Sequence, residues 1–539
     1  MLKRIIIVLL VVPLLAVAQE KSPAKDDKKA AKTEQTGKKD SKADKSEKKG
    51  GKAESDDKAE RKSDRGGVPP VVRAAVGTTA SADDGSLRIT LVDKKQNYST
   101  AGSLAQYRDS AVNSPKSANI HPDGTKYYVN SLEGCQTIVY DLRSNKRLKV
   151  INHRFGASQQ QLWAPEQGLF KFTHYPSRDV RTFRGKPVES TFSHGGRYLW
   201  VPYYRRDFDL NAQDPSAIAV IDTRSDEIIR LFDTGPLPKM IACSHDGSTI
   251  AVSHWGNNTV GLIDVSSATP ADWRYLINIP TPRELELNFS LTSPVDRDRN
   301  SGLLLRGTVF TPDDRYLLVG SMAGGGICVI DVAKREYKGK LTGSARPRHL
   351  VIGGGYLYLS SNVQGLVQRK KLDEVIAACE RLHGGESITL SGWKECRVGG
   401  GARTLELSPS GNYAFVACNS ASKLCVVDTR KMKMIAQIDV DSYPVGLALS
   451  DDGTTAIVTS QGRKGNGGNA ENIYKVEYAT PEPVPAKAEP QEECTQEAEK
   501  AQSGEANSTS TFNLPLLLGI GGALVALLLV FYLINRKKK

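Results

Sequence analysis

The sequence predicts an all-β fold, a seven-bladed β-propeller, and two observations lead to this prediction. The first is a pattern that recurs seven times: a short apolar run, a tight turn rich in Gly or Asp, and a second apolar run. The second is that these runs alternate in polarity and carry β-branched side chains, as strands do. Strand-rich repeats at intervals of roughly 40–70 residues are typical of propeller blades. The turns, with a weaker seventh copy at Ile352–Gly355, are Ile120–Gly124, Phe192–Gly196, Cys243–Gly247, Phe310–Asp314, Leu407–Gly411 and Leu449–Gly453.

One unit shows how we expect each blade to be built. Residues 404–407 predict a first strand, residues 413–418 a second, residues 423–428 a third and residues 434–440 a fourth, with short polar turns between them. The third strand ends in an Asp, which can begin a turn by bonding its own backbone. This ending recurs at Asp141, Asp222, Asp264, Asp331 and Asp428.

This unit resembles the YVTN-type β-propeller repeat. Ser408–Asn419 is the best local match, and Val426–Thr429 fits the third strand of that repeat. The resemblance extends over about residues 85–476 and implies a seven-bladed toroid, in a family that includes many extracytoplasmic binding proteins of unassigned ligand. We expect Leu87–Val92, which precedes the first complete unit, to close the ring by pairing with the last blade.

The N-terminal end predicts export. Residues 1–18 resemble a signal peptide, with a basic start, an apolar stretch from Ile5 to Leu15 and a small-x-small cleavage pattern. The alternative is an N-terminal membrane anchor, for which the apolar run is short. Residues 19–66 predict a disordered linker, because residues 21–65 hold 16 Lys or Arg and 11 Asp or Glu but almost no large apolar side chain.

The C-terminal end predicts a stalk and a single membrane span. Residues 477–513 are acidic and rich in Pro, Glu and Ala, with eight Glu against two Lys. Residues 514–534 form an uncharged, mostly apolar run, long enough to cross about 30 Å of hydrocarbon as a helix. Residues 535–539 end in four cations, which predict a cytoplasmic tail by the positive-inside rule. We therefore expect a propeller at residues 67–476, tethered outside the cytoplasm, in the periplasm or at the cell surface.

The folded part of the chain is basic. Residues 66–476 hold 49 Lys or Arg and 40 Asp or Glu. This excess suits an anionic partner such as a small molecule, a polymer, lipid headgroups or an acidic envelope protein. Nucleic acid would also fit the charge, but the sequence contains no specific nucleic-acid-binding motif.

One position of the repeat concentrates positive charge. The first strand of a propeller blade is innermost, and we expect its start to lie at one mouth of the central channel. Aligned repeats place Val188 and Val445 at this position in two blades and a cation in the other five. Either an anion offsets the repulsion among these cations, or duplication has propagated a residue that has no role. The predicted ligand-binding cations are Lys116, Lys239, Arg306, Arg348 and Arg403.

Two loops are expected on the same face. Tyr203–Arg206 lies on a long loop and His254–Asn257 on a short one. Aromatic rings beside Arg could stack on bases or sugars, or they could cap the blade edges. The further candidate ligand-binding residues are Tyr204, Arg205, Arg206 and Trp255.

Eight cysteines in an exported chain permit disulfides without requiring them. Cys379 and Cys396 bracket an insertion at residues 371–400, in which residues 372–382 predict a short amphipathic helix packed on the propeller. Cys418 and Cys425 lie on successive strands of one unit. These two pairs are the disulfide candidates.

The functional prediction is a membrane-tethered module that binds an anionic ligand, or a protein, at the basic mouth of the channel. The motifs G-x-S-x-G, H-E-x-x-H, the P-loop and the dinucleotide fingerprint do not occur, and we predict no cofactor, metal site or catalytic residue. Two alternatives stay open. One is a hydrolase or lactonase acting on a small acid or sugar acid, which needs an acid or His inside the channel. The other is an adhesive or scaffolding element of the cell envelope.

Overall fold

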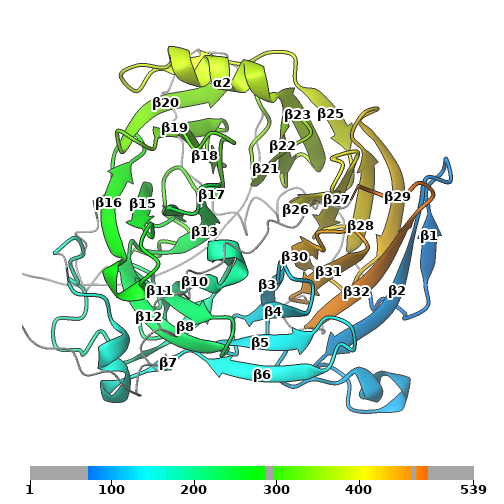
Figure 1. The fold of residues 1–539 in the computed structure, drawn as a ribbon, viewed down its shortest axis with the longest axis horizontal. Coiled ribbons are helices and arrows are strands. Elements are labelled where there is room, and N and C mark those ends of the chain that lie inside the picture. The colour runs from blue at the N-terminus through cyan, green and yellow to red at the C-terminus, as the bar shows by residue number, and fades with distance from the viewer. Residues whose placement is uncertain (1–70, 167, 287–294, 463–468, 484–539) are drawn as a thin grey trace, which may run out of the picture. The chain divides into compact units, whose positions relative to one another are not determined.

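The structure, a computed structural model, describes residues 71–166, 168–286, 295–462 and 469–483. All of them belong to one compact unit of the chain, Ala53–Lys539. They fold into seven mainly antiparallel sheets set around a common axis, as Figure 1 shows. The predicted seven-bladed β-propeller is therefore the observed fold.

Three blades are simple four-stranded meanders, and in each the first-named strand is the innermost (Figure 1). Blade 1 consists of β3 (Pro115–Ile120), β4 (Lys126–Ser131), β5 (Gln136–Asp141) and β6 (Arg147–Asn152). Blade 3 consists of β13 (Pro238–Cys243), β14 (Thr249–His254), β15 (Thr259–Asp264) and β16 (Arg274–Pro280). Blade 6 consists of β26 (Ala402–Leu407), β27 (Tyr413–Cys418), β28 (Lys423–Asp428) and β29 (Lys433–Asp439).

Blade 7 closes the ring with a strand from the other end of the propeller. Its sheet runs from β30 (Pro444–Leu449) through β31 (Thr455–Ser460) and β32 (Ala470–Tyr478) to β2 (Leu87–Gln96) and β1 (Thr79–Ser81). β2 pairs antiparallel with β32, from Leu87 opposite Tyr478 to Gln96 opposite Ala470. The predicted closure by Leu87–Val92 is confirmed, and it removes two open sheet edges.

The other blades carry the expected insertions. Blade 2 consists of β9 (Thr191–Ser193), β10 (Tyr198–Arg206), β11 (Ser216–Asp222) and β12 (Glu227–Thr234). The second half of β10 pairs with the additional strand β8 (Phe183–Pro187), which pairs in turn with β7 (Arg154–Phe155). Blade 4 consists of β17 (Leu305–Phe310), β18 (Tyr316–Ser321), β19 (Ile327–Asp331) and β20 (Glu336–Thr342). Short 3-10 helices occur at Gly102–Tyr107, Ala157–Leu162, His194–Gly196 and Pro270–Asp272.

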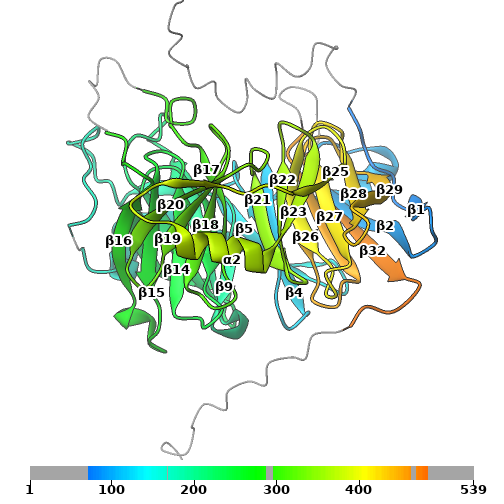
Figure 2. The ribbon, with the colours of Figure 1, turned by 90° about the horizontal axis from the view of Figure 1, so that it is seen from above.

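The segment 371–400 is part of blade 5 rather than an addition to it. After β21 (His349–Gly353), β22 (Tyr356–Ser361) and β23 (Leu366–Lys371), the chain forms helix α2 (Leu372–Arg381). It then pairs β24 (Ser387–Thr389) in parallel with β20 of blade 4 and returns as β25 (Lys394–Arg397), the fourth strand of blade 5. The predicted helix is confirmed, and Figure 2 shows it crossing the outer side of blades 4 and 5.

The Asp that ends the third strand begins a turn, as predicted. In five blades its carboxylate accepts a hydrogen bond from a backbone N–H two or three residues later, which fixes the turn to the fourth strand. The pairs and their distances are Ser144 to Asp141 at 2.7 Å, Arg224 to Asp222 at 2.9 Å, Ser266 to Asp264 at 3.0 Å, Lys334 to Asp331 at 3.0 Å and Arg430 to Asp428 at 2.9 Å.

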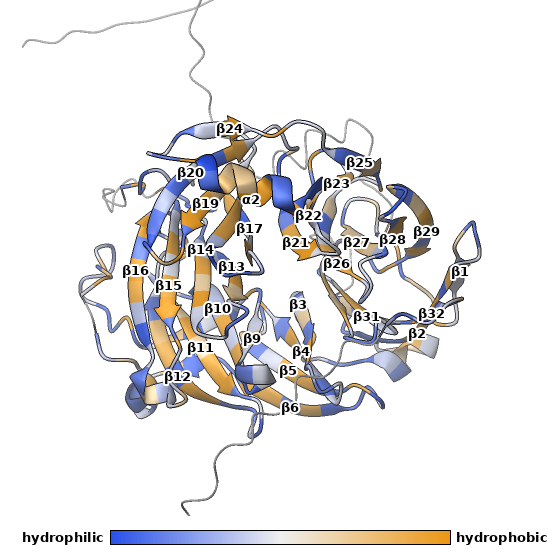
Figure 3. Cartoon of the chain, turned by 45° about the horizontal axis from the view of Figure 1, so that its top comes forward, coloured by the Kyte–Doolittle hydropathy of each residue, from blue (hydrophilic) through white to orange (hydrophobic). Residues whose placement is uncertain are grey.

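The core lies mostly between neighbouring sheets rather than at the axis. Strands carry most of the hydrophobic residues, shown in orange in Figure 3, and the turns are mostly hydrophilic. Trp200 of β10 is fully buried in such a layer between blades 2 and 3. Val375, Ala378 and Cys379 of α2 are buried in the layer between blades 4 and 5, which explains why the apolar face of this helix needs no further partner.

The predicted disulfides are not formed, because all seven cysteines of the described residues carry free thiols. Cys379 packs in the layer between blades 4 and 5, whereas Cys396 packs in the next layer, between blades 5 and 6. Cys418 and Cys425 lie closer, with their sulfur atoms 3.8 Å apart, and both are fully buried. Bracketing an insertion along the chain therefore did not bring Cys379 and Cys396 together.

Several predicted segments lie outside the described residues: the signal peptide at 1–18, the linker at 19–66, most of the stalk at 477–513, the membrane span at 514–534 and the tail at 535–539. Residues 477 and 478 of the predicted stalk belong to β32. Where the chain is described, no helix is both long enough and apolar enough to cross a membrane.

Candidate functional site

In four of the five blades that carry it, the repeated basic position lies on an irregularity of the innermost strand, whereas in blade 5 Arg348 comes directly before β21. In blade 1, Pro115 pairs with Ser131 and Ser117 pairs with Asn130, so Lys116 has no opposite residue on β4. The same one-residue bulge occurs in the innermost strands of blades 3, 4, 6 and 7. A β-bulge redirects the side chain that it carries. The bulge explains how each of these strands can keep its blade pairing and still direct one side chain differently from its neighbours.

Carbonyl groups at this position also join four pairs of neighbouring blades. These joints are made by backbone carbonyls and do not depend on which side chain stands at the position. Hydroxyl groups of one blade donate to the carbonyl at this aligned position in the following blade: Ser117 to Val188 at 2.6 Å, Ser253 to Arg306 at 3.1 Å, Thr404 to Val445 at 2.8 Å, and Ser360 to Arg403.

The five predicted cations are all buried, with residue exposures of 5–7%. The pKa of Lys116 lies well below its usual value, first because of burial and then because Arg403, Arg306 and Arg348 bring positive charge close to it. Residues of blades 1, 4, 5 and 6 therefore lie close enough for their charges to interact. We call Lys116, Arg306, Arg348 and Arg403 the basic cluster.

Lys239 is neutralised by a carboxylate from the segment before blade 4. Its ammonium lies 3.1 Å from the carboxylate of Asp298. Burial raises the pKa of Asp298, but Lys239, Tyr204 and Arg306 outweigh burial and hold it at about 2. The Lys239 ammonium also lies 4.2 Å from the ring centre of Tyr204 and 4.8 Å from that of Trp255. The charge of Lys239 is therefore matched by Asp298, and its ammonium group is enclosed by the rings of Tyr204 and Trp255.

Three of the four predicted aromatic and arginine residues lie at or beside Lys239. Trp255 and Tyr204 contact Lys239, but Trp255 is only 2% exposed and packs in an apolar cluster with Leu237 and Met322. Arg205 is partly exposed, stacks on Tyr204 and donates to the carbonyl of Leu210. These contacts make Tyr204 and Trp255 part of the wall around Lys239.

Arg206 does not lie with the predicted cations, as the sequence had suggested. It is 1% exposed, lies over the rings of Phe172 and Phe183, and pairs with Asp233. These contacts place it inside blade 2, away from the basic cluster. The sequence misled because β10 extends past its blade and pairs with β8, which turns Arg206 inward.

Two carboxyl groups near the basic cluster were missed by the sequence reading. Glu189 contributes negative charge at Lys116, and it is also the charge that acts on Glu406 of β26. Burial, and then Glu189, raise the pKa of Glu406 to about 8. Glu406 follows Arg403 by three residues, just as Asn119 follows Lys116, so the equivalent position of blade 1 has an amide rather than an acid and the repeat gave no signal.

A histidine also lies beside the cluster. Burial, together with the charges of Arg306 and Arg348, lowers the pKa of His349 to about 4 although the Leu405 backbone opposes this. Its Nδ1 is 3.0 Å from the Leu405 carbonyl oxygen of the next blade. The lowered pKa indicates a neutral ring at pH 7, and the contact with Leu405 holds blades 5 and 6 together.

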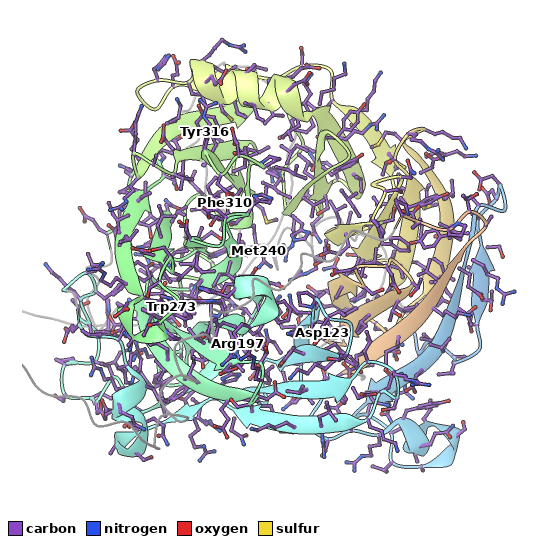
Figure 4. The ribbon with its side chains drawn as sticks, in the orientation of Figure 1. Asp123, Arg197, Met240, Trp273, Phe310 and Tyr316 are labelled. Carbon is purple, nitrogen blue, oxygen red and sulfur yellow. The ribbon has the colours of Figure 1, made fainter. Side chains whose placement is uncertain are left out.

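The arrangement is suited to anion binding. Three guanidinium groups offer paired N–H donors that match the oxygen atoms of a carboxylate or phosphate, and a lysine adds a fourth charge. Figure 4 shows Met240, the neighbour of Lys239 in β13, toward the centre of the ring, whereas Trp273 and Tyr316 lie within the blades. Among the residues described here, no three His, Cys, Asp or Glu side chains are grouped to hold a metal ion.

No family model and no curated protein matches the chain. Among solved structures, the chain is similar to hydrazine synthase of Kuenenia stuttgartiensis, at 15% identity and a TM-score of 0.45, over 66% of this chain and 95% of that one. It is also similar to the β-propeller domain of Cps50 (Swd1) of Myceliophteria thermophila, at 11% identity and a TM-score of 0.47, over 71% of this chain and all of that one. Similarities at these levels carry no argument about function.

Proposed function

We propose that this protein is an exported, membrane-tethered propeller of the YVTN repeat type that binds an anionic ligand at the basic cluster. A β-propeller is in general a binding or scaffolding module. The signal-like start, the apolar run at 514–534 and its basic flank support export and tethering. The basic cluster supports the choice of an anion.

The observation that carries the proposal is the environment of Lys116. This residue is 7% exposed, and among the described residues its ammonium makes no hydrogen bond and no ion pair. Three guanidinium groups lie close enough to lower its pKa, and the one acid that acts on it among the main contributors is Glu189. Two like charges about 4 Å apart repel by roughly 1 kcal/mol in water and about 4 kcal/mol near a protein surface. A bound anion would convert this repulsion into attraction.

The test is a thermal-unfolding titration of the purified protein with inorganic phosphate and with acetate, at constant ionic strength. A ligand that binds only the folded state raises the unfolding temperature. We expect either probe to stabilise the wild-type protein, and Lys116→Met to weaken its affinity about tenfold or more, since a charge-assisted hydrogen bond contributes about 1.5–3 kcal/mol. Without either probe, Lys116→Met should unfold at a higher temperature than the wild type, because it relieves repulsion.

The matched control is Lys146→Met, which removes an exposed cation from the same blade. This variant should bind the probes as the wild type does. If neither probe stabilises the wild type, or if Lys116→Met and Lys146→Met behave alike, the proposed site is wrong.

One observation supports the alternative function, a hydrolase acting on a small acid or lactone. The charge of Glu189 acts both on Lys116 of the basic cluster and on the carboxyl group of Glu406, whose pKa is raised. A general acid with a pKa near neutrality would suit that chemistry. Turnover of simple lactones by the wild-type protein, lost in Glu406→Gln, would favour hydrolysis over binding alone. Binding without turnover would remove this alternative.

A further inference from the structure

The layer between blades 7 and 1, which are neighbours in the ring (Figure 1), contains polar as well as apolar side chains. Its apolar part includes Ile457 of β31, Ile473 of β32 and Tyr127 of β4. Successive side chains of a strand point to opposite faces, and residues two apart share a face. Thr459 and Glu471 therefore point into this layer, because each lies two residues from one of these isoleucines. They are also opposite each other in the pairing of β31 with β32.

Four oxygen atoms in this layer are buried without a hydrogen-bond partner. Glu471, Thr459 and Tyr127 are all fully buried. In the described part of the chain, no hydrogen bond reaches either carboxyl oxygen of Glu471, the hydroxyl of Thr459 or the hydroxyl of Tyr127. Buried polar atoms in folded proteins nearly always have a partner. Two blades that bring such groups to one joint therefore point to a ligand that oxygen atoms can bind.

The charged groups around Glu471 are paired with one another. Lys95 is opposite Glu471 in the pairing of β2 with β32, but its ammonium lies 3.1 Å from the carboxylate of Asp93. Asp109, on the segment before blade 1, pairs with Arg147 at 2.5 Å. These two acids and two cations balance, so an ionised Glu471 adds one negative charge that none of them matches.

We propose that a monovalent metal ion, sodium or potassium, binds between blades 7 and 1 to the carboxylate of Glu471 and to the hydroxyl oxygens of Thr459 and Tyr127. Hard cations prefer oxygen ligands of these kinds, and one positive charge balances Glu471. A divalent cation fits less well, because it would leave one positive charge unmatched in a buried site, and the described residues group no three His, Cys, Asp or Glu side chains there. None of these groups belongs to the basic cluster, so the inference does not rest on the proposed function.

Binding of the metal ion should compete with protonation of Glu471. Burial raises the pKa of Glu471 to about 8; the nearby Tyr140 hydroxyl opposes this rise, Asp109 adds to it, Lys95 opposes it and Asp93 adds to it. The metal ion binds the ionised carboxylate, so it binds more tightly above pH 8 than below it. The loss of stability that burial imposes on an ionised Glu471 therefore applies to buffers without these ions.

The test is thermal unfolding of the full-length protein at pH 9 and at pH 6, in equal concentrations of sodium, potassium or choline chloride. Choline supplies the same ionic strength but is too large for a space enclosed between two blades. We expect sodium or potassium to raise the unfolding temperature by about 2 °C or more above its value in choline at pH 9, and by less at pH 6. The metal ion with the larger effect is the one that the site prefers.

Three variants test the ligands. Glu471→Gln should abolish the difference between the metal ions and choline, and Thr459→Val and Tyr127→Phe, which keep the shape of each side chain, should each reduce it. The two hydroxyl variants keep the test decisive if Glu471→Gln does not fold. The matched control is Glu477→Gln, which removes a partly exposed acid from the same strand and should keep the full difference.

Three outcomes would overturn the proposal. The first is an equal unfolding temperature in all three salts at pH 9, which would mean that the site holds no metal ion. The second is a difference that survives in Glu471→Gln or that is as large at pH 6 as at pH 9, because the ion would then act elsewhere. The third is a larger effect of calcium chloride than of both monovalent salts at equal ionic strength, lost in Glu471→Gln, which would assign the site to a divalent cation.

Discussion

The buried ion pair of Lys94 with Asp441 should be one of the most sensitive points of the fold. Lys94 lies on the closing strand β2 and is fully buried, and its ammonium donates to Asp441 at 2.7 Å, Tyr98 at 2.9 Å and the carbonyl of Ala74 at 3.0 Å. Asp441, which is 1% exposed, also accepts from Asn472 at 2.7 Å. Every donor of the ammonium is therefore used at the place where the two ends of the propeller meet.

Lys94→Met removes the charge and keeps most of the side-chain volume. It leaves the Asp441 carboxylate buried without a cation, and breaking a buried pair in this way costs about 3–5 kcal/mol of unfolding free energy. The double variant Lys94→Met/Asp441→Asn removes the second charge as well. We expect it to be more stable than Lys94→Met alone, by about 1–3 kcal/mol, because residues in one network couple by this amount.

The assay is urea unfolding of the purified protein, followed by tryptophan fluorescence and by circular dichroism. The matched control is Lys423→Met, which breaks a 2.5 Å pair with Asp439 in blade 6 whose side chains are 33% and 49% exposed. An exposed pair contributes about 1 kcal/mol or less, so this variant should differ little from the wild type.

A loss below about 1 kcal/mol for Lys94→Met would refute the reasoning, since it would mean that the buried carboxylate is compensated in another way. A double variant less stable than Lys94→Met would also refute it. That result would show that Asp441 stabilises blade 7 through Asn472 and Tyr98 rather than through its charge pair.

Two further predictions concern the joint between blades 7 and 1. Glu471 is fully buried, and burial raises its pKa to about 8, well above the usual value near 4.5. Because the unfolded chain loses this proton first, the wild-type protein should lose stability as pH rises from about 4.5 to 8, with a slope of up to about 1.4 kcal/mol per pH unit from this group. Glu471→Gln should remove the contribution of Glu471 to this slope and be more stable than the wild type at pH 8. Urea unfolding between pH 4.5 and pH 8 measures both effects, and an unchanged slope in the variant would contradict the raised pKa of Glu471. Gly446→Ala would place a methyl group 2.8 Å from the Lys116 carbonyl oxygen of blade 1, and we expect a loss of about 1–3 kcal/mol in the same assay. Gly156→Ala, with no neighbour within 3.4 Å of its methyl group, should be nearly neutral, and equal effects would show that the joint tolerates the methyl group.

The repeated features of the fold could be predicted from sequence because each copy reinforces the others. The Asp at the end of the third strand, the closing strand at Leu87–Val92 and the aligned basic position all follow from one unit written several times. The structure brings Lys116, Arg306, Arg348 and Arg403 close enough to influence one another. A repeat places equivalent residues around an axis, so their convergence needs no knowledge of long-range packing.

Features that occur once could not be predicted in the same way. Glu189 and Glu406 each stand in a single blade, so no alignment of repeats singles them out. The role of Arg206 depends on the pairing of β10 with β8, which comes from an insertion. The separation of Cys379 from Cys396 depends on β24 crossing to blade 4 before β25 returns. Each of these placements is decided by contacts between segments that follow no repeated pattern.

The blades that lack a cation show that the fold does not need one at this position. The carbonyl of Val188 accepts hydrogen bonds from Ser117 and Asn130, and the carbonyl of Val445 accepts one from Thr404. Valine therefore serves the joint between blades as well as lysine or arginine does. The joint between blades therefore does not explain why the other five blades carry lysine or arginine at this position, and we propose that four of these cations bind an anionic ligand.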